Sequence, residues 1–209
     1  MTSVYSRHGF PSARRAAAPG AALALCYIDA MTSELDVLRI VSERLAAVGI
    51  SFMLTGSYAM AYYATPRMTR DLDLVLALGG EDVDRLVAVF SHDFYVDADA
   101  ARSAVRTQQL FNLLHLESGV KVDFIVRKDS EYRQLEFSRR KRIELNGIQT
   151  WIVSREDLIL SKLVWARHAS SELQRRDVKA LLDGPYDQTY VQQWAALLEV
   201  ADLLKEIAR

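Results

Sequence analysis

Three aspartates carry the clearest signal for chemistry in this sequence. Asp71 and Asp73 flank a leucine at the start of an apolar segment, and Asp123 is the one acid within the apolar segment 120–126. In a β-strand, residues two apart point to the same face, so Asp71 and Asp73 would lie side by side. Neighbouring carboxylates repel each other unless water or a cation compensates, and Mg²⁺ prefers carboxylate and phosphate oxygens together. The alternative is an exposed edge strand with two surface acids.

Asp123 extends this arrangement if its strand pairs with the strand of Asp71 and Asp73. Three carboxylates could then hold two metal ions about 4 Å apart, one carrying a triphosphate and one lowering the pKa of an attacking hydroxyl. Asp123 could also act as a general base. We therefore expect all three aspartates to be catalytic and metal-binding, with two Mg²⁺ ions as the cofactor and Mn²⁺ as an alternative metal.

A candidate phosphate-binding turn precedes the first two aspartates. Gly56 allows a tight turn and a close approach of the backbone to a ligand. Ser57 follows where a short helix is expected to begin, and the N–H groups at a helix N-terminus favour phosphate. Ser57 is equally compatible with an ordinary N-cap, the commonest role of serine at such a position.

The hydrophobic pattern predicts the elements that must position these residues. It indicates an α+β protein with a catalytic half followed by helices, because the apolar period changes from two to 3.6 after Val153. We predict a disordered extension over 1–30, a catalytic domain over 31–153 and a C-terminal helical subdomain over 154–209. The three helices of that subdomain are expected over about 154–168, 171–183 and 188–207.

The order of these features resembles the DNA polymerase β-type nucleotidyltransferase superfamily. The resemblance rests on Gly56-Ser57, a short helix, Asp71-Leu-Asp73 and a lone strand aspartate, Asp123. The fuller string resembles the AbiEii/AbiGii toxin-like branch and spans about residues 35 to 185. Its further matching residues are Tyr62 or Tyr63, Arg67, Thr69, Lys162, Ala166, Arg167 and Asp177.

The resemblance implies a nucleotidyltransferase-type mixed sheet flanked by helices. It implies Mg²⁺-dependent transfer of a nucleoside monophosphate from an NTP to an acceptor. Lys162 would be catalytic as well as nucleotide-binding. The full set of implied nucleotide-binding residues is Gly56, Ser57, Arg67, Thr69 and Lys162. The spacing from Arg167 to Asp177 departs from the branch's pattern, which leaves the role of Asp177 open.

Several readings of the function remain open on the sequence. The acceptor could be a tRNA, a protein or a small molecule, and the chain could be the toxin of a toxin–antitoxin system with a cognate antitoxin. One alternative is an aminoglycoside-type antibiotic nucleotidyltransferase. Another is a non-catalytic nucleotide-binding or antitoxin-like module. The sequence does not indicate which NTP is used.

Composition excludes some classes of protein. The chain has 209 residues and a formal net charge of −1, so no global charge favours nucleic acid or an acidic membrane. One cysteine, Cys26, allows no intrachain disulfide. No stretch reaches the roughly 18 apolar residues of a transmembrane helix, so we expect a cytoplasmic protein without a membrane partner.

Two other sequence features have ordinary structural explanations. The basic run 139–142 is typical of a solvated strand edge that blocks aggregation, although it could contact a nucleic acid. Trp151, Trp165 and Trp194 are expected to pack in the core or an interface rather than to stack on bases.

Overall fold

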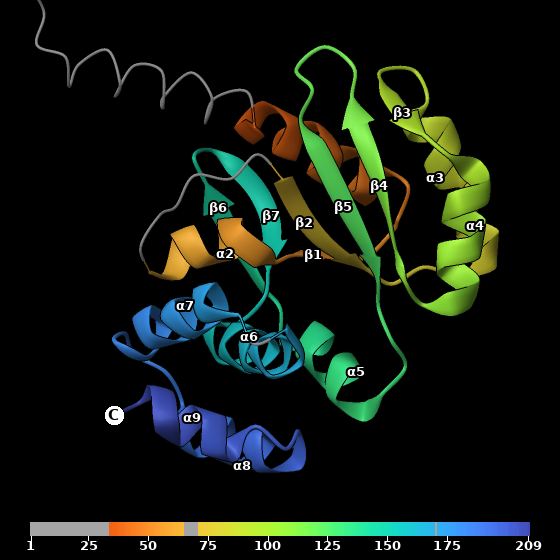
Figure 1. Ribbon diagram of the computed structural model, residues 1–209. Coiled ribbons are helices and arrows are strands. Elements are labelled where there is room, and N and C mark those ends of the chain that lie inside the picture. Colours follow the sequence, from red (N-terminus) through yellow and green to blue (C-terminus); the bar gives the residue numbers. More distant parts are fainter. Residues whose placement is uncertain (1–33, 65–70, 170) are drawn as a thin grey trace, which may run out of the picture. The chain divides into compact units, whose positions relative to one another are not determined.

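The computed structural model describes residues 34–64, 71–169 and 171–209, which belong to one compact unit, Ser33–Arg209. This part of the chain forms a seven-stranded mixed sheet with helices around it, which confirms the expected α+β class (Figure 1). The strand order is β3-β4-β5-β2-β1-β7-β6. β2 runs parallel to β5 and β1 parallel to β7, whereas the other neighbours are antiparallel.

The strands are short, with three to six residues each. Their bounds are β1 Phe52–Leu54, β2 Asp71–Leu76, β3 Phe94–Val96, β4 Leu110–His115, β5 Lys121–Val126, β6 Lys141–Leu145 and β7 Ile148–Ile152. Asn146 and Gly147 join β6 to β7 with positive φ angles of 48° and 78°, as a tight hairpin turn requires.

The helices surround this sheet at both of its sides. Residues 34–47 are helical, and a 3₁₀ turn spans Gly80–Asp82. The remaining helices are α2 Gly56–Tyr63, α3 Val83–Phe90, α4 Ala98–Thr107, α5 Glu131–Ser138, α6 Arg155–Ala169, α7 Glu172–Leu182, α8 Gln188–Leu197 and α9 Ala201–Ile207. In Figure 1, α3 and α4 lie beside β3 and β4, whereas α6 to α9 gather below β1 and β7. Among the described residues, none of the helices is both long and apolar enough to cross a membrane.

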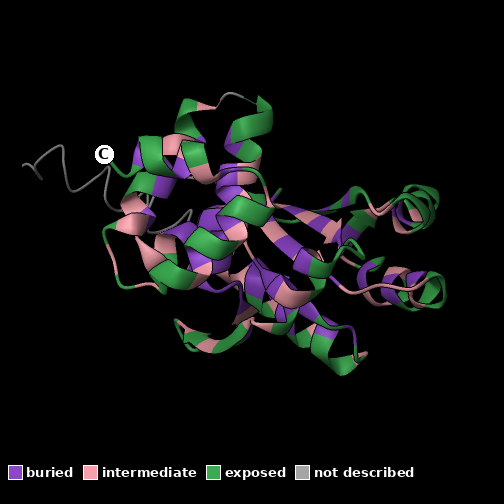
Figure 2. Ribbon diagram, turned by 90° about the horizontal axis from the view of Figure 1, so that it is seen from below, coloured by how far each residue is buried: buried purple, intermediate pink, exposed green. Residues whose placement is uncertain are grey.

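The two faces of the central strands differ sharply in character. Leu72 and Leu74 on β2 and Val122 and Phe124 on β5 are completely buried. The residues that alternate with these along β2 and β5 point to the opposite face of the sheet and are partly buried or exposed. Buried positions gather in the interior between the sheet and its helices (Figure 2). One face therefore anchors the sheet, which leaves the other face available for polar side chains.

The helix over 34–47 is tied to separate parts of the sheet. The hydroxyl of Ser42 lies 3.1 Å from that of Thr150 on β7, and both residues are buried. Arg44 donates to both carboxylate oxygens of Asp93, at 2.5 and 2.7 Å, next to the start of β3. This charge-assisted pair lowers the pKa of Asp93 below its usual value.

A buried carboxylate joins α5 to the C-terminal helices α6 and α8. Asp157, fully buried near the start of α6, accepts from the Ser154 hydroxyl at 2.5 Å, Arg139 at 3.0 Å and the Tyr190 hydroxyl at 2.7 Å. Its own backbone N–H donates to the Ser154 hydroxyl at 3.1 Å. These contacts link α5, α6 and α8, so they hold the helix that lines the candidate site.

The basic run is only partly a solvated edge. Lys141 and Arg142 are exposed on the edge strand β6, as expected. Arg139 instead stacks over the Tyr190 ring at 3.8 Å while it pairs with Asp157. Arg140 lies over the rings of Phe137 and Trp151, at 4.3 and 4.8 Å. The solvated-edge interpretation is therefore wrong for Arg139 and Arg140, because aromatic side chains cover their guanidinium groups.

One further expectation is corrected by the structure. The last helix, expected over about 188–207, is two helices, because Glu199 takes a left-handed φ of 58° between α8 and α9. Trp165 is 59% exposed, so the core is excluded from the two expected positions, core and interface. Trp151 is partly buried against the core, and Trp194 contacts the Tyr132 ring, with centroids 5.2 Å apart, as expected.

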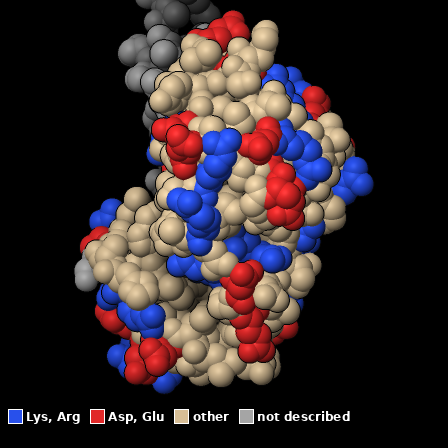
Figure 3. All heavy atoms as spheres, turned by 90° about the vertical axis from the view of Figure 1, so that its right-hand side faces the viewer, with Lys and Arg blue, Asp and Glu red and all other residues tan. Residues whose placement is uncertain are grey.

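Charges are interspersed on the face formed around α3 and α4. Figure 3 shows acidic and basic side chains alternating there. Arg102, for example, pairs with Asp84 at 2.8 Å and with Asp99 at 3.0 Å. Exposed pairs of this kind contribute little to stability.

Candidate active site

The parallel pairing of β2 with β5 places two aspartates directly beside each other. In the register of these strands, Asp73 is opposite Asp123 and Asp71 is opposite Lys121. Neighbouring strands lie about 4.8 Å apart, and side chains alternate between the two faces of a sheet. Residues directly opposite each other on paired strands, such as Asp73 and Asp123, point to the same face. The expected pairing of the Asp123 strand beside that of Asp71 and Asp73 is therefore confirmed, and the two carboxylates share one sheet face.

This proximity perturbs the ionisation of Asp73. Burial and the negative charges of Asp123 and Asp71 raise the pKa of Asp73 from 3.8 to about 6, whereas a backbone hydrogen bond from Ser57 and the charge of Lys121 act in the opposite direction. The largest cause is the loss of solvation. A bound cation would offset both the burial and the carboxylate repulsion that disfavour the charged form of Asp73.

Gly56 is required at the turn for two separate reasons. Its φ of +61° lies in the left-handed region, and a Cβ at this position would lie 1.9 Å from Oδ2 of Asp73. The backbone N–H of the preceding Thr55 donates to the Asp73 carbonyl oxygen at 2.9 Å. The absence of a side chain at residue 56 thus lets the Asp73 carboxylate lie against the turn.

Ser57 lies inside α2 and is not its N-cap. Thr55 occupies the N-cap position and makes no side-chain capping hydrogen bond. Ser57 is 5% exposed, and its backbone N–H donates to the Asp73 carboxylate. The N-cap interpretation of Ser57 is therefore wrong, and the start of α2 is directed towards the acidic site.

Asp123 has spare capacity to bind a ligand. Its Oδ2 accepts from Lys121 at 2.9 Å, whereas its Oδ1 is buried without a hydrogen-bond partner. Within the described ranges, no group of three or more His, Cys, Asp or Glu side chains is arranged to hold a metal ion. Mg²⁺ in nucleotide sites commonly takes one or two protein carboxylates and completes its shell with phosphate and water. The pair Asp73 and Asp123, with one unsatisfied oxygen, fits that mode of binding.

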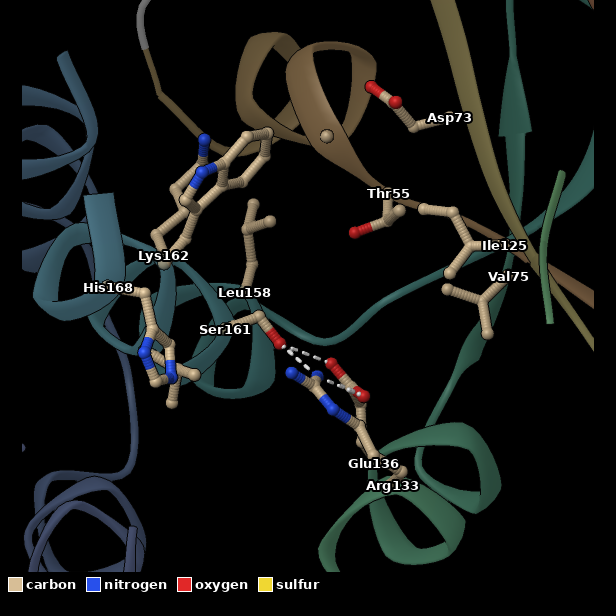
Figure 4. Close-up of a pocket in the computed structure, with 13 residues that line it drawn as sticks. Thr55, Asp73, Val75, Ile125, Arg133, Glu136, Leu158, Ser161, Lys162 and His168 are labelled. Carbon is tan, nitrogen blue, oxygen red and sulfur yellow. Dashed lines mark hydrogen bonds and ion pairs between the residues drawn. The ribbon is translucent and has the colours of Figure 1, made fainter. Parts of the chain in front are cut away.

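A pocket of about 330 Å³ opens beside Asp73. Figure 4 shows Asp73 and Thr55 at one end, Val75 and Ile125 along one wall, and Lys162 on the opposite wall. The pocket therefore lies between the acid-bearing face of the sheet and helix α6.

Lys162 is buried at the pocket wall and held by α7. Its ammonium group donates to Asp177 at 2.6 Å and to Gln174 at 3.1 Å. The side chains of Lys162 and Asp177 are only 5% and 7% exposed. A buried ammonium needs such a partner, so Asp177 fixes the position of Lys162.

The remaining residues implied by the resemblance are not all part of this site. Arg67 and Thr69 lie outside the described residues. Arg167 donates to the carbonyl oxygens of Leu198 and Glu199, at 2.8 and 3.2 Å, where α8 ends. Asp71 lies on the acid-bearing face and is exposed.

The structure also adds residues that the sequence did not single out. Arg133 and Glu136 from α5 and Ser161, Trp165 and His168 from α6 line the pocket. The helical spacing of the α6 residues places them on one face, but nothing in the sequence indicated that α5 would meet that face.

Comparison with known proteins supports the fold. No known family profile and no curated protein sequence match the chain. An antigenic nucleotidyltransferase-like protein from Paracoccidioides brasiliensis is similar in structure, with a TM-score of 0.52, 18% identity, and coverage of 84% of this chain and 92% of that one. The antibiotic-resistance factor ANT(2'')-Ia has a TM-score of 0.48 at 14% identity, over 85% of this chain and 89% of its own. The similarity to the Paracoccidioides brasiliensis protein shows that the fold of this chain is that of nucleotidyltransferase-like proteins.

We predict that Gly56→Ala displaces the Asp73 carboxylate. In the variant, alanine must adopt a φ in the left-handed region. Its Cβ must also avoid the Asp73 carboxylate, which lies well within van der Waals distance of that position. Gly49→Ala is the matched control, because Gly49 has a φ of +70° but a Cβ there would meet nothing within 4 Å. In chemical denaturation, Gly56→Ala should lose about 1 kcal/mol or more beyond the loss of the control. Equal losses in the two variants would contradict the close approach of Asp73.

We predict that Asp73→Asn stabilises the protein at neutral pH but not in acid. Because the folded-state pKa of Asp73 is raised, to about 6, the wild type loses stability as pH rises from the unfolded-state value of about 4 through 6. An asparagine avoids this loss and still accepts the Ser57 hydrogen bond. The variant should gain at most about 3 kcal/mol in unfolding free energy at pH 7.5, and little at pH 4. Urea denaturation at both pH values, with exposed Glu117→Gln as the control, measures the difference; a gap independent of pH would contradict the assignment.

Proposed function

We propose that this chain is a Mg²⁺-dependent nucleotidyltransferase that transfers a nucleoside monophosphate from an NTP to an acceptor. The observation that carries the proposal is the register of Asp73 with Asp123 next to the Gly56 turn. Lys162 lies on the wall of the pocket that begins there. A carboxylate pair, a helix start and a buried lysine together suit a triphosphate with its cation.

The reaction follows from the positions of these groups. The acceptor's hydroxyl oxygen would attack the α-phosphorus of the NTP, the bond from that phosphorus to its bridging oxygen would break, and pyrophosphate would leave. Asp123, which is in register with Asp73, would accept the hydroxyl proton as a general base. Mg²⁺, held by Asp73 and Asp123 with Asp71 nearby, would supply charge stabilisation for the phosphates, with Mn²⁺ as a substitute.

The turn and the lysine would position the triphosphate. Gly56 and Ser57 at the start of α2 would approach the outer phosphates, and Lys162 would neutralise charge that develops on the leaving group. Asp177 and Gln174 hold the lysine at the wall. Arg67 and Thr69 are assigned to the nucleotide by the sequence resemblance alone.

The sheet face next to Asp123 is open for an acceptor. Asn112 on β4 is opposite Asp123, and Leu110 and Leu114 lie on the same face. Both leucines are exposed, at 55% and 42%. An acceptor hydroxyl can therefore approach Asp123 across β4 while the nucleotide occupies the pocket on the other side.

The proposal extends to the cellular role and to three classes of acceptor. The sequence resemblance to the AbiEii/AbiGii branch favours a toxin with a cognate antitoxin. The acceptor classes are a tRNA, a protein and a small molecule such as an aminoglycoside.

We predict pyrophosphate release and label transfer from at least one α-labelled NTP in the presence of Mg²⁺. The assay presents total tRNA, total protein and an aminoglycoside panel, so the labelled product identifies the acceptor. Asp73→Asn should reduce turnover at least about a hundredfold, because metal-held charge stabilisation is worth several kcal/mol. Glu117→Gln should retain activity.

The controls separate the enzyme from its alternatives. Turnover that survives in Asp71→Ala/Asp73→Ala would contradict the proposed metal site. Tight Mg²⁺-dependent NTP binding without transfer to any acceptor would favour a nucleotide-binding module. An absence of NTP binding would contradict the proposed function altogether.

A further inference from the structure

The two ends of the pocket have different chemistry. Asp73 and Thr55 lie at one end, and Arg133, Glu136 and Ser161 lie at the other (Figure 4). The first end is suited to phosphate and a cation, as argued above. The second end lies beyond an apolar stretch, so a nucleotide that enters phosphate-first against Asp73 would direct its base towards it.

The far end is a closed hydrogen-bonded cluster. Glu136 is 4% exposed and accepts from the Ser161 hydroxyl at 2.6 Å through Oε1 and from Arg133 at 2.7 Å through Oε2. The same nitrogen of Arg133, Nη1, also donates to the Ser161 hydroxyl oxygen at 2.6 Å. Both carboxylate oxygens of Glu136 are therefore already used within the cluster.

Arg133 retains hydrogen-bonding capacity that the cluster does not use. A guanidinium group has five N–H donors, and within the described part of the chain Arg133 makes both of its hydrogen bonds through Nη1. Its Nε and Nη2 make none there, and the residue lines the pocket. The far end consequently offers N–H donors to a ligand, whereas the strongest acceptor nearby, Glu136, is occupied and already compensates the charge of Arg133.

The walls between the two ends suit a flat ring. Val75 and Ile125 from the sheet line one side, and Leu158, Val164 and Trp165 from α6 line another. Apolar and aromatic side chains of this kind bind the faces of bases without regard to their identity. Selection among bases would therefore depend on the polar end.

We propose that Arg133 binds the base edge and that the pocket selects guanine, uracil or cytosine over adenine. This inference rests on the proposed function. Each of the three favoured bases has a carbonyl oxygen that accepts from a guanidinium group. Adenine has no carbonyl oxygen. Its ring acceptors N1 and N7 each lie beside the amino group, which would place a donor against the second donor of Arg133. A guanidinium N–H that the bound base covers without offering an acceptor weakens the binding of that base.

Calorimetric titration of the full chain with Mg²⁺ and the α,β-methylene analogues of the four NTPs tests this inference. All four analogues resist transfer. At least one of the GTP, UTP and CTP analogues should bind at least about tenfold more tightly than the ATP analogue, as expected for a good side-chain-to-base contact. An ATP analogue that binds as tightly as the best of the other three would overturn the inference.

The double variant Arg133→Met/Glu136→Gln tests the assigned residues. It removes the donors together with the buried charge they compensate, so the four affinities should converge to within about threefold. Arg106→Gln, which removes an exposed arginine on α4, should keep the wild-type order. Discrimination that persists in the double variant would overturn the role of Arg133. If the double variant does not fold, the comparison of four analogues on the wild type decides the inference.

These outcomes are distinguishable from failure of the proposed function. Mg²⁺-dependent binding with a preference for adenine would contradict the base selection alone. If no analogue binds, or if Asp73→Asn binds each analogue as the wild type does in Mg²⁺, the nucleotide site itself is wrong, and the base inference fails with it.

Discussion

Two like charges held side by side constrain the rest of this structure. The parallel pairing of β2 with β5 brings Asp73 and Asp123 to adjacent positions on one sheet face. Burial and mutual repulsion raise the pKa of Asp73 to about 6, and one oxygen of Asp123 is buried without a partner. A stable core on the opposite face, which includes Leu72, Leu74 and Phe124, must offset this cost.

The surrounding elements are arranged around that pair. Gly56 gives the Asp73 carboxylate room against the turn, and α2 begins there. Helix α6 presents Lys162 across the pocket, and the buried network at Asp157 ties α6 to its neighbours. The polar site on one face of the sheet is thus positioned by α2 and α6, which are themselves stabilised by contacts buried away from the site.

The local features of the site could be predicted from the sequence, but contacts between distant helices could not. Alternation of acids with apolar residues identified the Asp73 and Asp123 strands, and the glycine marked the turn. No spacing signal connects α5 with α6, so the cluster of Arg133 and Ser161 was missed. The break before α9 was missed because Glu199 adopts a left-handed φ, which is unusual for a residue that is not glycine.

Anomalous diffraction from a crystal grown with Mn²⁺ and a non-transferable NTP analogue tests the central claim most directly. The account predicts a manganese peak within coordination distance of carboxylate oxygens from both Asp73 and Asp123, and of the analogue's phosphates. The base of the analogue should extend along the pocket towards α5. A manganese ion bound elsewhere, or an analogue whose phosphates lie away from Gly56, would contradict it.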